Sequence, residues 1–97
     1  MIDVRLPRLL SSVTAVDDLL VDEIEHLHGA VVVLNGRDLR AATPSSAREF
    51  VKVVLVDGGA SRLELVGLPE DFELDIEVAA RAHGVEERVH RPPMSVG

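Results

Sequence analysis

The 97-residue sequence contains no cysteine, tryptophan or tyrosine and only two phenylalanines. Without cysteine the chain cannot form a disulfide framework, and it has no thiolate for catalysis or for holding a metal ion. With two aromatic rings it also lacks the side chains that stack on nucleic-acid bases and that dominate most protein-binding hot spots. A core must therefore be built from the aliphatic residues that make up most of the 46% hydrophobic content.

Basic residues are also scarce, because 10 Lys and Arg stand against 17 Asp and Glu, giving a formal net charge of −7. The basic residues are scattered along an acidic chain that repels a phosphate backbone, so we expect no nucleic-acid partner. The longest apolar runs, 30–34 and 53–56, are far below the roughly 20 residues that span a bilayer. Asp3 interrupts the N-terminus, where a signal peptide would need a long apolar segment. We expect a soluble, cytoplasmic protein with no membrane partner.

Motifs that carry chemistry are missing as well. No Gly-rich phosphate loop follows a predicted strand, and no Gly-x-Ser-x-Gly sequence or nucleophile with an identifiable base is present. His26 and His28 stand two residues apart on a predicted helix, so they point in different directions and cannot chelate one metal ion. The sequence therefore predicts no catalytic residue, no cofactor and no metal, and the protein is not expected to be an enzyme.

Hydrophobic periodicity predicts strands that alternate with helices. The β-branched run 30–34 indicates a central strand covered on both faces, and Thr14, with Asp17 three residues later, indicates a helix N-cap. Thr43 before Pro44 indicates a second helix start, and Gly58-Gly59 its end. The predicted elements are a strand at 2–6, a helix at 15–28, a strand at 30–34, a helix at 44–57, a strand at 62–66, a helix from 69 to 83 and a short edge strand at 85–89.

This order implies right-handed crossovers and a small, mostly parallel sheet. The predicted fold class is α/β, with about four strands and three helices. The chain is long enough for one domain, which we place at residues 1–90. Residues 91–97, which contain Pro92-Pro93 and show no periodicity, are predicted to be a flexible C-terminal tail.

Two serines in the first turn of the second predicted helix are the strongest candidates for function. A phosphoryl group on Ser45 or Ser46 would lie where free backbone amides and the helix dipole favour negative charge. On the same helix, at about 100° per residue, Val53 and Val56 are expected to face solvent, away from the core. The predicted partner-binding residues are Thr43, Ser45, Ser46, Glu49, Lys52, Val53 and Val56.

Two simpler interpretations of these residues stay open. The hydroxyl groups of Thr43, Ser45 and Ser46 are also ordinary caps for the backbone donors at a helix start. The two valines can equally belong to a helix that is covered on both sides, or be isolated exposed apolar residues of the kind that most surfaces carry.

Between about residues 14 and 89 the pattern resembles the STAS domain, the fold of bacterial anti-sigma-factor antagonists, and especially its divergent STAS-like forms. The apolar run 30–34, the helix start Thr43-Pro44-Ser45-Ser46-Ala47, the strand 63–67 and His83-Gly84-Val85 stand where that family has its corresponding elements. Pro44 stands where the family has an aspartate, and Ala47 where it usually has a glycine. The resemblance implies a protein-binding switch. In such a switch, an anti-sigma-factor-type kinase that binds the protein phosphorylates Ser45, which breaks the complex between the two.

The predicted function is thus a non-catalytic protein-protein interaction module, with a regulatory switch of the anti-sigma-factor-antagonist type as the more specific hypothesis. The alternative is a small structural or accessory protein that associates with itself, through the sheet edge or the same helix.

Overall fold

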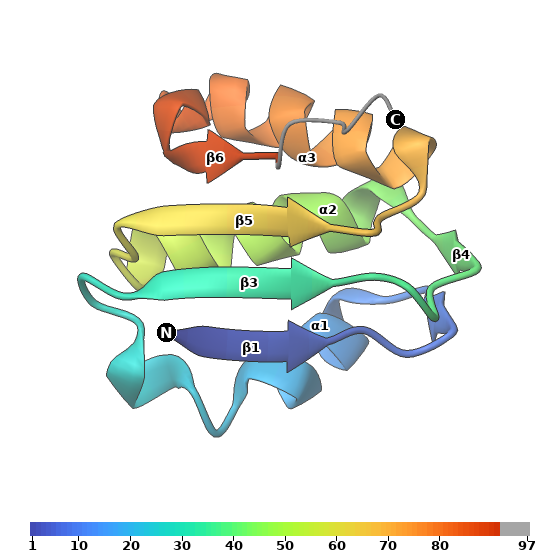
Figure 1. Ribbon diagram of the computed structural model, residues 1–97, viewed down its shortest axis with the longest axis horizontal. Coiled ribbons are helices and arrows are strands. Elements are labelled where there is room, and N and C mark those ends of the chain that lie inside the picture. Colours follow the sequence, from blue (N-terminus) through green and yellow to red (C-terminus); the bar gives the residue numbers. More distant parts are fainter. Residues whose placement is uncertain (92–97) are drawn as a thin grey trace, which may run out of the picture.

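The computed structural model describes residues 1–91 and confirms the α/β fold class. Residues 92–97, most of the predicted tail, lie outside the described residues. A sheet of four parallel strands has the order β1 (Ile2–Arg5), β3 (Val31–Asn35), β5 (Arg62–Val66), β6 (Val89–His90), and the three α-helices are α1 (Val13–Leu20), α2 (Pro44–Phe50) and α3 (Glu70–Ala82) (Figure 1). Two short strands, β2 (Leu9–Leu10) and β4 (Ala41–Ala42), form a separate parallel pair.

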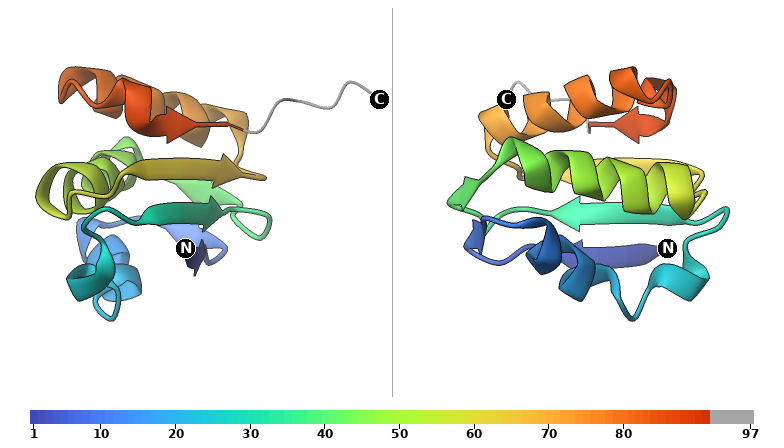
Figure 2. Two further views of the ribbon diagram at one scale, coloured as in Figure 1. Left: turned by 60° about the vertical axis from the view of Figure 1, so that its left-hand side comes forward. Right: turned by 180° about the vertical axis from the view of Figure 1, so that it is seen from behind.

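All three helices lie on one face of the sheet. Each crossover steps in the same direction, from β1 to β3 to β5 to β6, and right-handed crossovers then place every helix on the same side. The helices stand behind the sheet in Figure 1 and in front of it in the reverse view of Figure 2. The prediction that strand 30–34 is covered on both faces is therefore wrong for the described chain, because no helix within residues 1–91 covers the other face.

The core fills the space between the sheet and the helical layer. Alternate residues of the strands point into it, so Val32 and Leu34 of β3 are fully buried while their neighbours are only half-buried. The helices contribute their apolar faces, and the two phenylalanine rings meet edge to face with centroids 6.2 Å apart. The largest fully buried side chains are those of Phe50, Leu6, Leu10, Leu20, Leu27, Leu34, Leu55, Leu63, Leu65, Ile76, Val16 and Val32.

Helix α1 begins and ends earlier than the sequence pattern predicts. Ser12 is its N-cap in place of Thr14, and the Ser12 hydroxyl accepts a hydrogen bond from the Ala15 amide at 3.2 Å. The helix ends at Leu20 rather than at residue 28, and a single 3₁₀ turn, η1 (Ile24–His26), follows. This break in the helix brings Leu27 into the core, where it is fully buried.

Helix α2 continues as a π-helix, η2 (Val51–Asp57), instead of an α-helix. At its end the Gly58 amide donates to the carbonyl of Val53, five residues earlier, at 2.9 Å. The wider turn changes which residues face the core. Val56 is exposed as predicted, but Val53 packs partly against the core, so the prediction that both valines face solvent is wrong for Val53.

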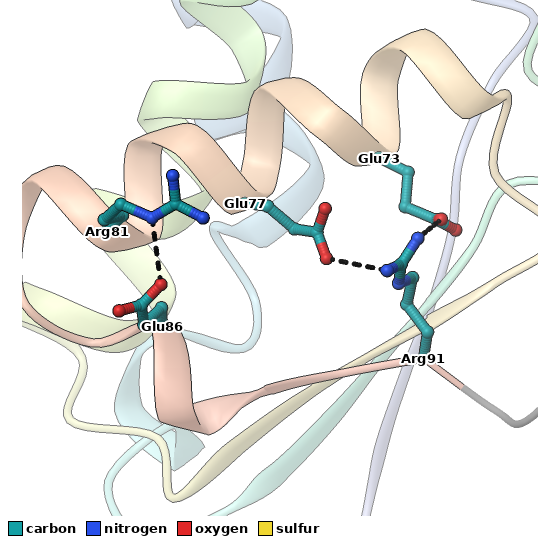
Figure 3. Close-up of polar contacts among 5 residues, drawn as sticks. All are labelled: Glu73, Glu77, Arg81, Glu86 and Arg91. Atoms are coloured by element: carbon teal, nitrogen blue, oxygen red, sulfur yellow. Dashed lines mark hydrogen bonds and ion pairs between the residues drawn. The ribbon is translucent and has the colours of Figure 1, made fainter.

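The C-terminal end of the described chain lies against α3. A 3₁₀ turn, η3 (Glu86–Arg88), precedes β6, so the edge strand is shorter than predicted and overlaps the predicted range 85–89 only at Val89. Arg91 Nη1 binds Glu73 Oε1 at 2.6 Å, and Nη2 binds Glu77 Oε1 at 3.1 Å (Figure 3). Arg91, the first residue of the predicted tail, thus has its guanidinium group beside two carboxylates of α3.

Gly58 provides a test of how the π-helix ends. A Cβ atom at this position would lie 2.6 Å from the Val53 carbonyl oxygen and 2.7 Å from a methyl carbon of Leu27. Since the carbonyl belongs to the backbone, it cannot move aside cheaply. We expect Gly58→Ala to lower the free energy of unfolding by about 1–3 kcal/mol, measured by urea denaturation. Asp57→Ala, at the exposed neighbouring position, is the control and should change it by less than about 0.5 kcal/mol; equal effects of the two substitutions would contradict this packing.

Candidate functional site

The predicted site lies at the start of α2, which the short strand pair anchors to the rest of the fold. Strand β4 pairs with β2 and leads directly into Thr43, the N-cap of α2. The Thr43 amide donates to the Leu10 carbonyl at 3.0 Å, and the Thr43 hydroxyl accepts from the Ser46 amide at 3.3 Å. The predicted capping role of Thr43 is confirmed, and its side chain is half-buried.

Ser46 is fully buried and belongs to the same anchor. Its hydroxyl donates to the Leu10 carbonyl at 3.0 Å. Because a serine hydroxyl has only one proton, Thr43 Oγ1 must be the donor in the 3.0 Å contact between the two side chains. The hydroxyl of Ser46 is thus enclosed and hydrogen-bonded, and in this structure it offers no surface to a kinase or to a binding partner.

Ser45 has a different environment, although it is the adjacent residue. It is half-buried, and its hydroxyl accepts a hydrogen bond from Nη2 of Arg48 at 3.2 Å. Arg48 is exposed and is not among the predicted site residues. Its spacing of three residues from Ser45 on a helix was the signal that could have identified it.

Ser45, Glu49, Lys52 and Val56 are spaced by four, three and four residues, and we call them the α2 stripe. Ser45 and Glu49 are half-buried, while Lys52 and Val56 are exposed, with 43% of Val56 accessible. Helix α2 contacts both α1 and α3 and lies between them in the helical layer (Figure 2). The first half of the stripe, Ser45 and Glu49, therefore lies on α2 between the other two helices, and its second half, Lys52 and Val56, lies on the π-helix η2 that continues α2.

A second carboxylate lies beside the stripe. Hydrogen bonding with Asp17 of α1 is the largest cause that raises the pKa of Glu49, followed by partial burial and the negative charge of Asp17. Lys52 acts in the opposite direction and Asp57 adds a smaller increase. Glu49 thus has a second acidic group, Asp17 of α1, as its neighbour, with Ser45 four residues before it and Lys52 three residues after it along its own helix.

Other surfaces of the described chain offer less chemistry. A depression of about 160 Å³ at the start of α3 is lined by Arg40, Asp71, Phe72 and Asp75, among others. This depression is smaller than most small-molecule sites, which usually measure roughly 300–1,000 Å³. Within residues 1–91 no three His, Asp or Glu side chains are grouped so that they could hold a metal ion, and no helix there is long and apolar enough to cross a bilayer.

Comparison of the chain with protein-family models, with curated proteins and with solved structures finds no match in any of the three. The resemblance to STAS domains rests on the sequence pattern alone.

The two serines should respond differently to substitution. Ser46→Ala removes the donor to the Leu10 carbonyl and the acceptor for the Thr43 hydroxyl, so we expect the free energy of unfolding to fall by about 1–3 kcal/mol. Ser45→Ala is the matched control and should change it by less than about 0.5 kcal/mol. Urea denaturation of both variants measures the difference. A Ser46→Ala protein as stable as the Ser45→Ala protein would contradict the anchoring role of Ser46.

Proposed function

We propose that the chain is a non-catalytic protein-binding module, that the α2 stripe is its contact surface, and that phosphorylation of Ser45 regulates the contact. The observation that carries this proposal is the contrast between the two serines. Ser45 is partly exposed and its hydroxyl accepts a hydrogen bond from Arg48, whereas Ser46 is fully buried and its hydroxyl donates to the Leu10 carbonyl. We also propose a cytoplasmic location, for which the support is the acidic, cysteine-free composition.

The stripe offers a partner three kinds of contact within a short length of helix. Val56 supplies an exposed apolar side chain, Lys52 a positive charge and Glu49 a carboxyl group whose pKa is raised. The binding energy would come mainly from burying Val56 and the helix surface around it. The charges of Glu49 and Lys52 would select a partner with complementary charges.

A phosphoryl group on Ser45 would change this surface strongly. It adds about two negative charges in the first turn of α2, where the helix dipole and Arg48 favour them. Arg48 would pair with the phosphate, while Glu49, four residues further along the helix, and its neighbour Asp17 are also acidic. A partner that fits the mixed charge of the unmodified stripe would then meet excess negative charge, so phosphorylation is expected to weaken the complex. The resemblance to anti-sigma-factor antagonists supports the same direction of control.

Self-association through the helix or the sheet edge is the second candidate. Strand β1 is at the edge of the sheet and pairs only with β3 within the described residues. An unpaired edge is a template for adding another strand. Light scattering coupled to size-exclusion chromatography of the unmodified chain and of Val56→Asp separates self-association through α2 from binding to another protein, since only a dimer that Val56→Asp abolishes would indicate self-association through this helix.

Substitution of Val56 tests the proposed surface. We expect Val56→Asp to reduce the recovery of bound protein at least tenfold when the tagged chain is isolated from its native cells and co-purifying proteins are quantified by mass spectrometry. The matched control is Val78→Asp on α3, which places the same charge at a residue that is 62% exposed. If the Val78→Asp protein loses the partner while the Val56→Asp protein retains it fully, the α2 stripe is ruled out as the contact surface.

The same preparation tests the switch separately from the surface. Phosphate should map to Ser45 and not to Ser46, and Ser45→Glu should release the partner that Ser45→Ala retains. Binding that depends on Val56 but is unchanged by Ser45→Glu would leave the contact surface in place and rule out regulation at Ser45.

A further inference from the structure

One face of the main sheet carries no described helix, and we call it the open face. Parallel sheets are almost always covered on both faces, so an uncovered face needs an explanation. Within residues 1–91, the valines at positions 31, 33 and 66 on this side do not pack against the core. Strand alternation and register place the following residues on the open face: Asp3, Arg5, Val31, Val33, Asn35, Arg62, Glu64, Val66 and His90.

The strand register arranges these residues in rows that cross the sheet. The first row contains Val31 beside Arg62, and the second contains, in order across the sheet, Asp3, Val33, Glu64 and His90. Moving from the first row to the second along β5 therefore changes a positive charge to a negative one, while β3 stays apolar. Arg62 and Glu64 form no ion pair with other residues of the described chain, whereas Arg5 on the same face is bound to Asp38 at 3.2 Å.

We infer that a second copy of this chain covers the open face. In the arrangement that fits best, a two-fold axis runs across the strands, between the first and second rows, and the strands of the two copies run in opposite directions. This single operation places Arg62 of each copy opposite Glu64 of the other, and Val31 of each opposite Val33 of the other. An isologous contact of this kind requires a self-complementary patch, and these two rows provide one.

The charge pattern favours a second copy over an unrelated partner. Along β5 of one chain the positive Arg62 is followed on the open face by the negative Glu64. A surface that complements this pattern has the two charges in the reverse order, and a second copy rotated by 180° presents that order. Two stacked sheets keep their strands within about 30° of each other, which allows the long side chains of Arg62 and Glu64 to meet. The neighbouring valines would then be buried together and add apolar contact.

The area of the face indicates a weak dimer. With strands about 4.8 Å apart and residues about 3.3 Å apart, the four strands have a flat area of about 250 Å². Stable complexes bury about 800 Å² on each partner. We therefore expect association that depends on concentration, between about 10 µM and about 1 mM, rather than a permanent dimer.

Charge reversal with rescue tests this arrangement on the full chain. Arg62→Glu and Glu64→Arg each place like charges opposite each other in both symmetric contacts, so each should raise the dimer dissociation constant at least tenfold, as measured by sedimentation equilibrium. The double variant Arg62→Glu/Glu64→Arg restores opposite charges and the net charge of −7. It should dimerise within about threefold of the unmodified chain.

Control variants separate this contact from general charge effects and from the proposed α2 surface. Arg8→Glu and Glu25→Arg make the same changes in net charge at exposed positions off the sheet and should leave the dissociation constant unchanged, as should Val56→Asp. If circular dichroism shows that Glu64→Arg does not fold, the comparison of Arg62→Glu with Arg8→Glu still tests the proposed contact, because both arginines are exposed. A chain that stays monomeric at 1 mM, or single variants that dimerise as well as the unmodified chain, would overturn the inference.

Discussion

The three crossovers of this chain all step across the sheet in one direction, and the rest of the structure depends on that constraint. It places every helix on the same face, so a single apolar layer must hold the fold together. That layer is almost wholly aliphatic, with Phe50 and Phe72 as its only aromatic rings. Because α2 connects the two central strands, it lies in the middle of the helical layer and presents its outer side between α1 and α3.

The anchoring of α2 links this scaffold to the proposed site. Thr43 and Ser46 tie the first turn of the helix to the Leu10 carbonyl, which fixes the orientation of that turn. Ser45 then points away from the anchor, towards Arg48. Two adjacent serines thus have separate roles, one in stability and one at the surface, because a helix rotates each residue by about 100° from the last.

The sequence predicted the features that follow from strong local signals. The order of the main strands and helices and the Thr43 cap are both confirmed. These signals are local in the chain, since a periodic apolar face or a capping residue acts within one or two turns.

The features that were wrong depend on contacts between distant segments. Helix α1 ends at Leu20, and after the following 3₁₀ turn Leu27 is buried while Ile24 is 50% exposed, which a continuous amphipathic pattern does not show. The π-helix changes the exposure of Val53, since the positions were assigned with α-helical rotation. The run 30–34 is apolar enough for a two-sided strand, but its outer valines lie on the open face. The burial of Ser46 likewise depends on Leu10, 36 residues away.

The measurement that tests the one-sided architecture most directly is nuclear magnetic resonance of methyl groups in the presence of a soluble paramagnetic relaxation agent, at a concentration low enough to keep the chain monomeric. Strong relaxation enhancement is predicted for Val31, Val33 and Val66 on the open face and for Val56 on the α2 stripe. The methyl groups of Val32, Leu34, Leu63 and Val54 should be protected. Equal protection of Val33 and Val32 in the monomer would contradict the account, because both faces of the sheet would then be covered within a single chain.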